Sequence, residues 1–362
     1  MQNRTYLKEL SVDNAKFLEI VEASICSVSL DNNEPLDYSE SSLRTIDGDY
    51  NSRWSDKSSG LVSFKNGKFG CLGEHSGYDG TISISFSLFI LMSLMEEEEP
   101  NWDEIPAKQI MSKELKFQID QTLRDEIEKV QRNVADVRNS ILVHCGQFDG
   151  YGKTVMKEQK IHPDSYIQMA LQLTYWKIHK SLAPTYETAT MRVFYHGRTE
   201  TVRSCSMEVV AWIAKMEDPK ATKQEKAKLF RGAAGAQNRL MNEARKGEGF
   251  DRHLFGLWCI ATENDIPIPE FYDDPLYSKS GGGGNFVLST STLGYSINVG
   301  FVAPMVMDGY GVFYSMLNDC VWIIITSYRD SEVTSSKRFY QTFEESMNEI
   351  RGLLEGSLDA KL

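Results

Sequence analysis

The chain mixes short stretches that have a two-residue hydrophobic repeat with longer stretches that have a helical repeat. Residues 61–64 and 69–73 alternate apolar and polar positions around Asn66-Gly67. That pair is typical of a two-residue hairpin turn in which both residues have positive φ. Residues 81–95 are apolar at nearly helical spacing and run into four glutamates. The pattern therefore predicts a β-hairpin followed by a helix, joined by residues 71–80.

The same two repeats predict the other elements, and the resulting mixture of strands and helices indicates the α/β class. Asp120 is a plausible N-cap for the helix that follows it. Loops are expected at residues 32–59 and 150–164. The predicted helices are 14–24, 120–139, 165–180, 207–216, 223–246, 252–264 and 335–354, and the predicted strands are 25–30, 115–119, 141–148, 189–203 (a strand or a hairpin), 286–291, 297–307 and 320–328.

An acidic stretch with two prolines, residues 96–108, separates two groups of these elements. Such a composition is typical of a solvated connection between domains. A chain of 362 residues is long enough to form two domains. We therefore predict a first domain at residues 1–118 and a second at residues 119–362.

Composition excludes several classes of function. A net charge of −12 argues against a general nucleic-acid binder, which gains affinity by neutralising phosphates. The six cysteines form no CxxC pair and the six histidines are scattered, so no metal site is expected. The longest apolar run, residues 82–95, is too short and too rich in serine for a membrane span, so no transmembrane segment is expected.

The connection between the predicted hairpin and helix, CLGEHSGYDG, contains the most distinctive chemistry. His75 has a side chain whose unperturbed pKa lies near neutrality, as a general base requires. Asp79 follows four residues later and could orient His75 or cap the next helix. The plainer interpretation is a turn histidine that is satisfied by its own backbone.

Three separate motifs together resemble the carnitine/choline acyltransferase family. They are NSRWSDK at residues 51–57, EHSxxDG around His75, and LSTS at residues 288–291. The resemblance runs from about residue 5 to residue 362. It implies two domains of the chloramphenicol-acetyltransferase type, the first of them incomplete here. Family members have a long N-terminal portion ahead of this histidine, whereas only 74 residues precede it in this chain.

The resemblance also implies roles for particular residues in acyl transfer between coenzyme A and a small quaternary-ammonium alcohol. His75 would be the general base and Ser291 the donor to the tetrahedral oxyanion. Ser289 would contact the alcohol. The GRTET stretch around Thr199 has the form found in carnitine-specific members. The carboxylate of carnitine would then be held by Tyr186, Thr199 and Arg252.

Coenzyme A is expected as a substrate, and no cofactor or covalent intermediate is required. The resemblance assigns its 3′-phosphate to Lys153 and Lys157, and places Asp164 near its adenine. In an acidic protein, an anionic ligand needs such a local cluster of lysines. A solvated basic loop is the alternative interpretation of the same residues.

The resemblance implies that the length of the acyl group depends on the residue at position 300, which is Gly300 here. Acetyl-transferring relatives have a bulky methionine at this position, so a glycine favours a medium-chain, octanoyl-like substrate. Acetyl or long-chain specificity remains an alternative, as does a truncated, inactive form that only binds a ligand or partner. The terminal Ala360-Lys361-Leu362 is a variant of the address read by peroxisomal import receptors. A peroxisomal monomer is expected.

Overall fold

The computed structural model describes residues 2–48, 52–98, 112–292, 294 and 300–356. The chain divides into two compact units, Met1–Asn139 and Ser140–Leu362. The predicted boundary after residue 118 lies one helix earlier. Helix α5 (Gln121–Asn139) belongs to the first unit, where Asn3 donates a hydrogen bond to Glu126. The C-terminal Ala360, Lys361 and Leu362 lie outside the described residues.

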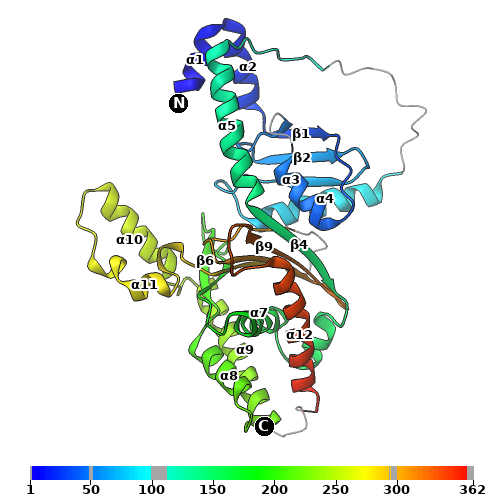
Figure 1. Ribbon diagram of the computed structural model, residues 1–362, viewed down its shortest axis with the longest axis vertical. Coiled ribbons are helices and arrows are strands. Elements are labelled where there is room, and N and C mark those ends of the chain that lie inside the picture. The colour runs from blue at the N-terminus through cyan, green and yellow to red at the C-terminus, as the bar shows by residue number, and fades with distance from the viewer. Residues whose placement is uncertain (1, 49–51, 99–111, 293, 295–299, 357–362) are drawn as a thin grey trace. The chain divides into compact units, whose positions relative to one another are not determined.

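The first unit is a small mixed sheet with helices (Figure 1). Strand β1 pairs with β2 in parallel, and β2 pairs with β3 as an antiparallel hairpin. The predictions of a helix and strand at 14–30 and of a hairpin and helix around His75 are confirmed, whereas α3 forms where a loop was expected. The elements are α1 (Gln2–Leu10), α2 (Val12–Ala23), β1 (Cys26–Asp31), α3 (Tyr38–Asp47), β2 (Ser59–Phe64), β3 (Phe69–Leu72) and α4 (Gly80–Glu96), followed by α5.

The hairpin turn differs from the predicted two-residue form. The Phe64 N–H donates to the Lys68 carbonyl over 2.9 Å, and the Gly67 N–H donates to the Phe64 carbonyl over 3.0 Å. Gly67 has a φ of 81°, and Asn66 is not among the residues with positive φ. This is the three-residue loop in which a type I turn is followed by a left-handed glycine. Only one positive-φ residue is therefore needed.

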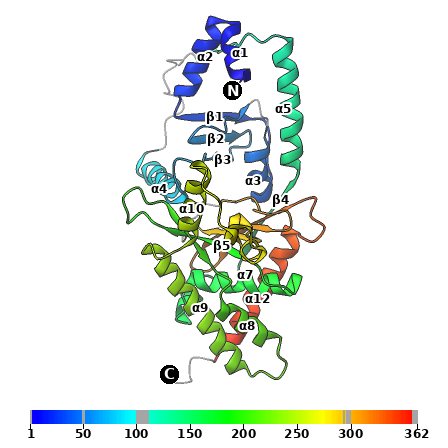
Figure 2. The same ribbon diagram turned by 90° about the vertical axis from the view of Figure 1, so that its left-hand side faces the viewer.

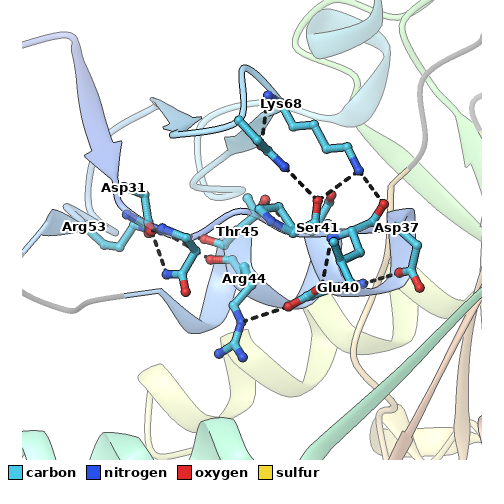
Figure 3. A network of polar contacts seen from close by, with 12 residues as sticks. Asp31, Asp37, Glu40, Ser41, Arg44, Thr45, Arg53 and Lys68 are labelled. Atoms are coloured by element: carbon cyan, nitrogen blue, oxygen red, sulfur yellow. Dashed lines mark hydrogen bonds and ion pairs between the residues drawn. The ribbon is translucent and has the colours of Figure 1, made fainter.

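Arg53 of the NSRWSDK motif is buried in the first unit and contacts both β1 and α3 (Figure 3). Arg53 pairs with Asp31 at 2.6 Å, with side chains 2% and 3% exposed. Arg53 also donates to the carbonyls of Arg44 and Thr45 at the end of α3. Burial by itself raises the pKa of Asp31, but hydrogen bonds from Asn33 and Arg53 lower it overall. The motif thus ties β1 to α3 within the unit that contains His75.

Part of the first unit's apolar surface is exposed. No residue of α4 is buried, although the helix is mostly Ile, Leu, Phe and Met. On the sheet, the row Val28–Leu61–Cys71 and the neighbouring Leu30 and Phe69 lie on one face and are exposed. In the described segments, we find no helix with the length and apolar character that a bilayer span requires.

The second unit is a six-stranded sheet covered by helices α7, α9 and α12 (Figure 2). The strand order is β4-β9-β8-β7-β5-β6, with β5, β7 and β8 parallel and the other pairs antiparallel. Its strands are β4 (Ile141–Phe148), β5 (Thr185–Thr190), β6 (Thr199–Arg203), β7 (Leu288–Thr292), β8 (Tyr310–Met316) and β9 (Val321–Tyr328). Its α-helices are α6 (Lys153–Glu158), α7 (Pro163–His179), α8 (Met207–Glu217), α9 (Lys223–Arg245), α10 (Asp251–Glu263), α11 (Pro275–Lys279) and α12 (Ser336–Leu354).

The mixed α/β class and most of the elements predicted after residue 112 are confirmed, and three predictions are wrong. Residues 115–119 form no strand; instead Gln118 exchanges two hydrogen bonds with the side chain of Asn14, which holds this segment on α2. The described part of the predicted strand 297–307 is irregular. The expected loop at 150–164 contains the short helix α6. Strand β8 was not recognised.

Candidate functional site

The predicted substrate and oxyanion residues share one face of the second sheet. Tyr186 on β5 is the register partner of Ser289 on β7, and Ser291 lies two residues further along β7 on the same face. Thr199 on β6 pairs with Thr190 and also belongs to this face, four residues along the hairpin from Tyr186. Glu187 follows Tyr186 on β5, and Thr290 lies between the two serines on β7. Their side chains therefore lie on the opposite face of the sheet, which α7 and α9 cover.

Arg252 reaches this face from the start of α10. Its Nη2 atom donates to the Tyr186 hydroxyl over 3.2 Å, and its guanidinium lies 5.9 Å from the Tyr186 ring centre. The Thr188 hydroxyl also lies 3.2 Å from the Tyr186 hydroxyl. A guanidinium beside two hydroxyls is an arrangement that suits a carboxylate. Two of the three residues predicted to hold the carboxylate of carnitine, Tyr186 and Arg252, are therefore in direct contact.

A second arginine, which the sequence did not single out, anchors the start of α10. Arg203 forms two hydrogen bonds with the carboxylate of Asp251, at 2.9 and 2.7 Å. Both side chains are largely buried, at 21% and 13% exposure. Arg203 is also the register partner of Tyr186 on β6. The Arg203–Asp251 ion pair thus holds the neighbouring Arg252 beside Tyr186. This arrangement depends on the pairing of β5 with β6, which the sequence alone did not reveal.

Gly300 lies next to β8, the strand that pairs with β7 at Ser291. A Cβ added there would lie 3.0 Å from Cζ of the Phe313 ring. Phe313 is 8% exposed and is the register partner of Ser291 on β8. The segment after Gly300 passes close to this face, because a side chain on Gly311 would overlap the carbonyl oxygen of Val302. A larger residue at position 300 would therefore press on the strand opposite Ser291.

The predicted coenzyme A lysines lie on α6. Lys153 and Lys157 are four residues apart and so project from the same side of this helix. Gly152 before them lets the backbone pass close to the β8–β9 turn, where the Lys153 N–H donates to the Leu317 carbonyl over 2.8 Å. A Cβ on Gly152 would lie 2.4 Å from that carbonyl oxygen. The glycine is thus what allows the lysines to dock here.

Asp164 lies in the first turn of α7 and is 8% exposed. Its Oδ1 accepts a hydrogen bond of 2.7 Å from the buried Tyr314 hydroxyl. Its predicted place near the adenine stays a prediction.

His75 lies in the first unit, between the end of β3 at Leu72 and the start of α4 at Gly80, as predicted. Its side chain is 73% exposed, and its Nδ1 atom lies 3.8 Å from Oδ1 of Asp79, which is 14% exposed. This is an ion-pair distance and is longer than a hydrogen bond. Asp79 occupies the N-cap position of α4, but its side chain makes no capping hydrogen bond. That Asp79 orients His75 therefore stays a prediction.

Within the second unit, one sheet face unites Tyr186, Ser289 and Ser291, with Thr199 along the hairpin and Gly300 against Phe313. His75 and Asp79 belong to the first unit. That His75 meets the serines during transfer stays a prediction.

The architecture defines a mixed α/β protein. The family model described as choline/carnitine O-acyltransferase matches residues 1–345, and the chain belongs to this family.

Curated relatives carry more specific names. Peroxisomal carnitine O-octanoyltransferase of Mus musculus is 36% identical over 356 residues, covering 97% of this chain and 58% of that protein. The Homo sapiens protein of the same name is 37% identical, covering 93% and 56%. Carnitine O-acetyltransferase of Homo sapiens is 32% identical, covering 86% and 49%. The chain thus spans a little over half the length of the octanoyltransferases it matches.

Among solved structures, the epimerization domain from the third module of tyrocidine synthetase B is similar with a TM-score of 0.41 at 10% identity, covering 92% of this chain and 80% of that chain. This match adds nothing to the family assignment.

Proposed function

We propose that this chain performs the carnitine acyl transfer of its family, moving a medium-chain acyl group between coenzyme A and the hydroxyl of carnitine. The observation that carries the proposal is the common sheet face of Tyr186, Ser289 and Ser291, with Arg252 hydrogen-bonded to Tyr186. A carboxylate held by Arg252 and Tyr186 would place the rest of carnitine along β5 and β7. The acyl carbon would then react beside Ser291.

The chemistry follows from the side chains. His75 takes the proton of the carnitine hydroxyl as that oxygen attacks the thioester carbonyl, and Asp79 stabilises the imidazolium that forms. Ser291 donates a hydrogen bond to the oxyanion of the tetrahedral intermediate, a contribution of about 3–4 kcal/mol in comparable enzymes. Collapse of this intermediate expels the thiolate of coenzyme A, which receives the proton from His75. No cofactor takes part in this sequence.

Substrate selection would rest on three positions in the second unit. Lys153 and Lys157 supply the positive charge for the 3′-phosphate of coenzyme A. We assign the acyl tail to the neighbourhood of Gly300, which has no side chain of its own beside Phe313. The names of the octanoyltransferase relatives support a medium-chain preference. Acetyl transfer is the first alternative, since carnitine O-acetyltransferases also match.

The same relatives support a peroxisomal location, reached through an import receptor that reads Ala360-Lys361-Leu362. The protein would act there as a monomer. Deleting these three residues should leave a fluorescent fusion in the cytosol. Import of the deleted protein would contradict this part of the proposal.

A different class of function, binding without catalysis, is favoured by one observation. The apolar residues of α4 and of one face of the first sheet are exposed. Such a surface is typical of a site that another polypeptide covers. In that case the chain would bind coenzyme A or a partner without catalysing a reaction.

The release of coenzyme A thiol from octanoyl-CoA in the presence of carnitine separates the two functions. Acyl transfer predicts carnitine-dependent release that is lost in both His75→Ala and Ser291→Ala. Binding without catalysis predicts no release above background, with calorimetric binding of coenzyme A that is unchanged by His75→Ala. Release that is independent of carnitine would contradict the acyl-transfer proposal.

A further inference from the structure

Behind the candidate substrate face, the second unit buries two carboxyl groups against each other. Glu187 on β5 is 1% exposed and Asp164 on α7 is 8% exposed, and their side chains are within hydrogen-bonding reach. Two ionised carboxylates in such contact repel strongly in a poorly solvated interior. The pair therefore needs a proton, and its neighbours indicate which group holds it.

Asp164 has its own hydrogen-bond partner on the other side of the pair. Its Oδ1 accepts a hydrogen bond from the Tyr314 hydroxyl over 2.7 Å. It also lies in the first turn of α7, a helix of 17 residues, where the helix dipole stabilises an anion.

The surroundings of Glu187 supply donors to one of its oxygens and none to the other. Its Oε2 accepts hydrogen bonds from the Ser204 hydroxyl and the Gln237 amide. Its Oε1 atom is buried and has no donor among the described residues. A proton on Oε1 that is donated to Asp164 would satisfy the last unpaired oxygen.

These hydrogen bonds belong to a ring that starts and ends on β5. The Tyr314 hydroxyl, which donates to Asp164, accepts from Gln168 over 2.9 Å. Gln168 also donates to the Thr290 hydroxyl over 2.9 Å, and Thr290 donates to the Tyr186 carbonyl over 2.7 Å. Thr290 lies between Ser289 and Ser291, and Tyr186 precedes Glu187. The ring thus ties the backbones of both candidate substrate strands to α7 and β8.

We propose that Glu187 is a positioning residue that holds a proton at neutral pH and donates it in a hydrogen bond to Asp164, which fixes β5 and β7 behind the substrate face. The effect on substrate rests on the proposed function, whereas the protonation state does not. Burial, together with the neighbouring Asp164, raises the pKa of Glu187. The ionisable groups that face it are Asp164 from α7, Tyr314 from β8 and, more weakly, Arg245 from α9.

The first test reads the proton directly. In the full chain labelled with carboxyl-¹³C glutamate, one glutamate resonance should remain at the protonated position at pH 7. It should be absent in Glu187→Gln and present in Glu332→Gln, which makes the same change at an exposed residue of the same unit. A spectrum in which every glutamate is ionised at pH 7 would overturn the proposal, whether or not the chain is an enzyme.

The second test uses the dependence of stability on pH. Because the pKa of Glu187 is raised in the folded protein, its stabilising proton is fully present below the ordinary value of 4.5 and is lost as the pH rises through the folded value. Between these values, the folding equilibrium constant of the wild type should fall up to about tenfold per pH unit relative to Glu187→Gln. Parallel pH curves for the two proteins would contradict the proposal.

The positioning role is read from carnitine kinetics. Glu187→Gln can still donate to Asp164 through its amide, whereas Glu187→Leu cannot, so Leu should raise the KM for carnitine at least tenfold and Gln should restore it. Thr290→Val removes the links to the Tyr186 carbonyl and to Gln168, and it should raise the same KM without changing that for acyl-CoA. Equal KM values in Gln and Leu variants that fold would refute the positioning role. Absence of activity in every variant would contradict the proposed function and leave the result of the labelling test standing.

Discussion

The Gly300→Met substitution should remove octanoyl transfer selectively. The first atom of the new side chain would lie 3.0 and 3.1 Å from Cζ and Cε1 of Phe313. Ordinary contacts between carbon atoms are about 3.5–4.0 Å. The ring is nearly buried and its backbone is paired with Ser291, so it has little room to move. The rest of the methionine must therefore enter whatever space lies beside the ring.

The size of the effect follows from the tail that this space would accept. Octanoyl has roughly six more methylene groups than acetyl, each contributing about 0.8 kcal/mol when buried. Full burial would thus favour octanoyl by up to about 5 kcal/mol. If methionine excludes half of the tail, octanoyl kcat/KM should fall roughly 50-fold, since about 1.4 kcal/mol corresponds to a factor of ten. Acetyl transfer should change little.

The assay is the ratio of octanoyl to acetyl kcat/KM, measured together with the melting temperature. Gly300→Ala should give an intermediate ratio, because it adds only the Cβ. Gly232→Met introduces the same residue on α9, where a Cβ meets nothing within 4 Å, and should leave the ratio unchanged. An unchanged ratio in Gly300→Met with a lowered melting temperature would show that Gly300 only permits close packing. That result would refute the medium-chain argument.

Three other substitutions test separate parts of the molecule. His75→Ala should lower the rate of transfer by about 10²–10⁴ with coenzyme A binding nearly intact, and near-normal turnover would exclude His75 as the base. Arg252→Ala should raise the KM for carnitine by a factor that corresponds to a binding loss of about 2–5 kcal/mol, with little change in the KM for acyl-CoA. Equal effects on both substrates would show that Arg252 has a structural role. Arg53→Ala should destabilise the protein by about 3–5 kcal/mol in denaturant titrations, because Asp31 is left buried and unpaired. Since the pKa of Asp31 is lowered overall, the pair's contribution is present above the ordinary value of 3.8 and should fade as the pH falls below it; no loss of stability at pH 7 would contradict this.

Local patterns were enough to predict the position of His75. Alternating residues before it and a helical repeat after it mark where β3 ends and α4 begins, and both features depend only on near neighbours. Helix α7 was also predicted from its local repeat, at residues 165–180. It begins two residues earlier, at Pro163, because proline at the first helical position needs no partner for its nitrogen. Strand β8 was missed because all seven of its residues are buried, so it shows no alternation.

The sequence by itself determined which residue types were present for acyl transfer and, through its motifs, which family to compare them with. Only the tertiary structure decided that Tyr186 and Ser289 are register partners, because parallel pairing joins segments that are far apart in the chain. It also decided that Glu187 faces Asp164. The buried position of Glu187 in the alternation of TYETAT was a signal, but its partner comes from α7 and cannot be inferred from the strand. Long-range packing has no local pattern, and that is why the candidate residues could be named from the sequence while their arrangement could not.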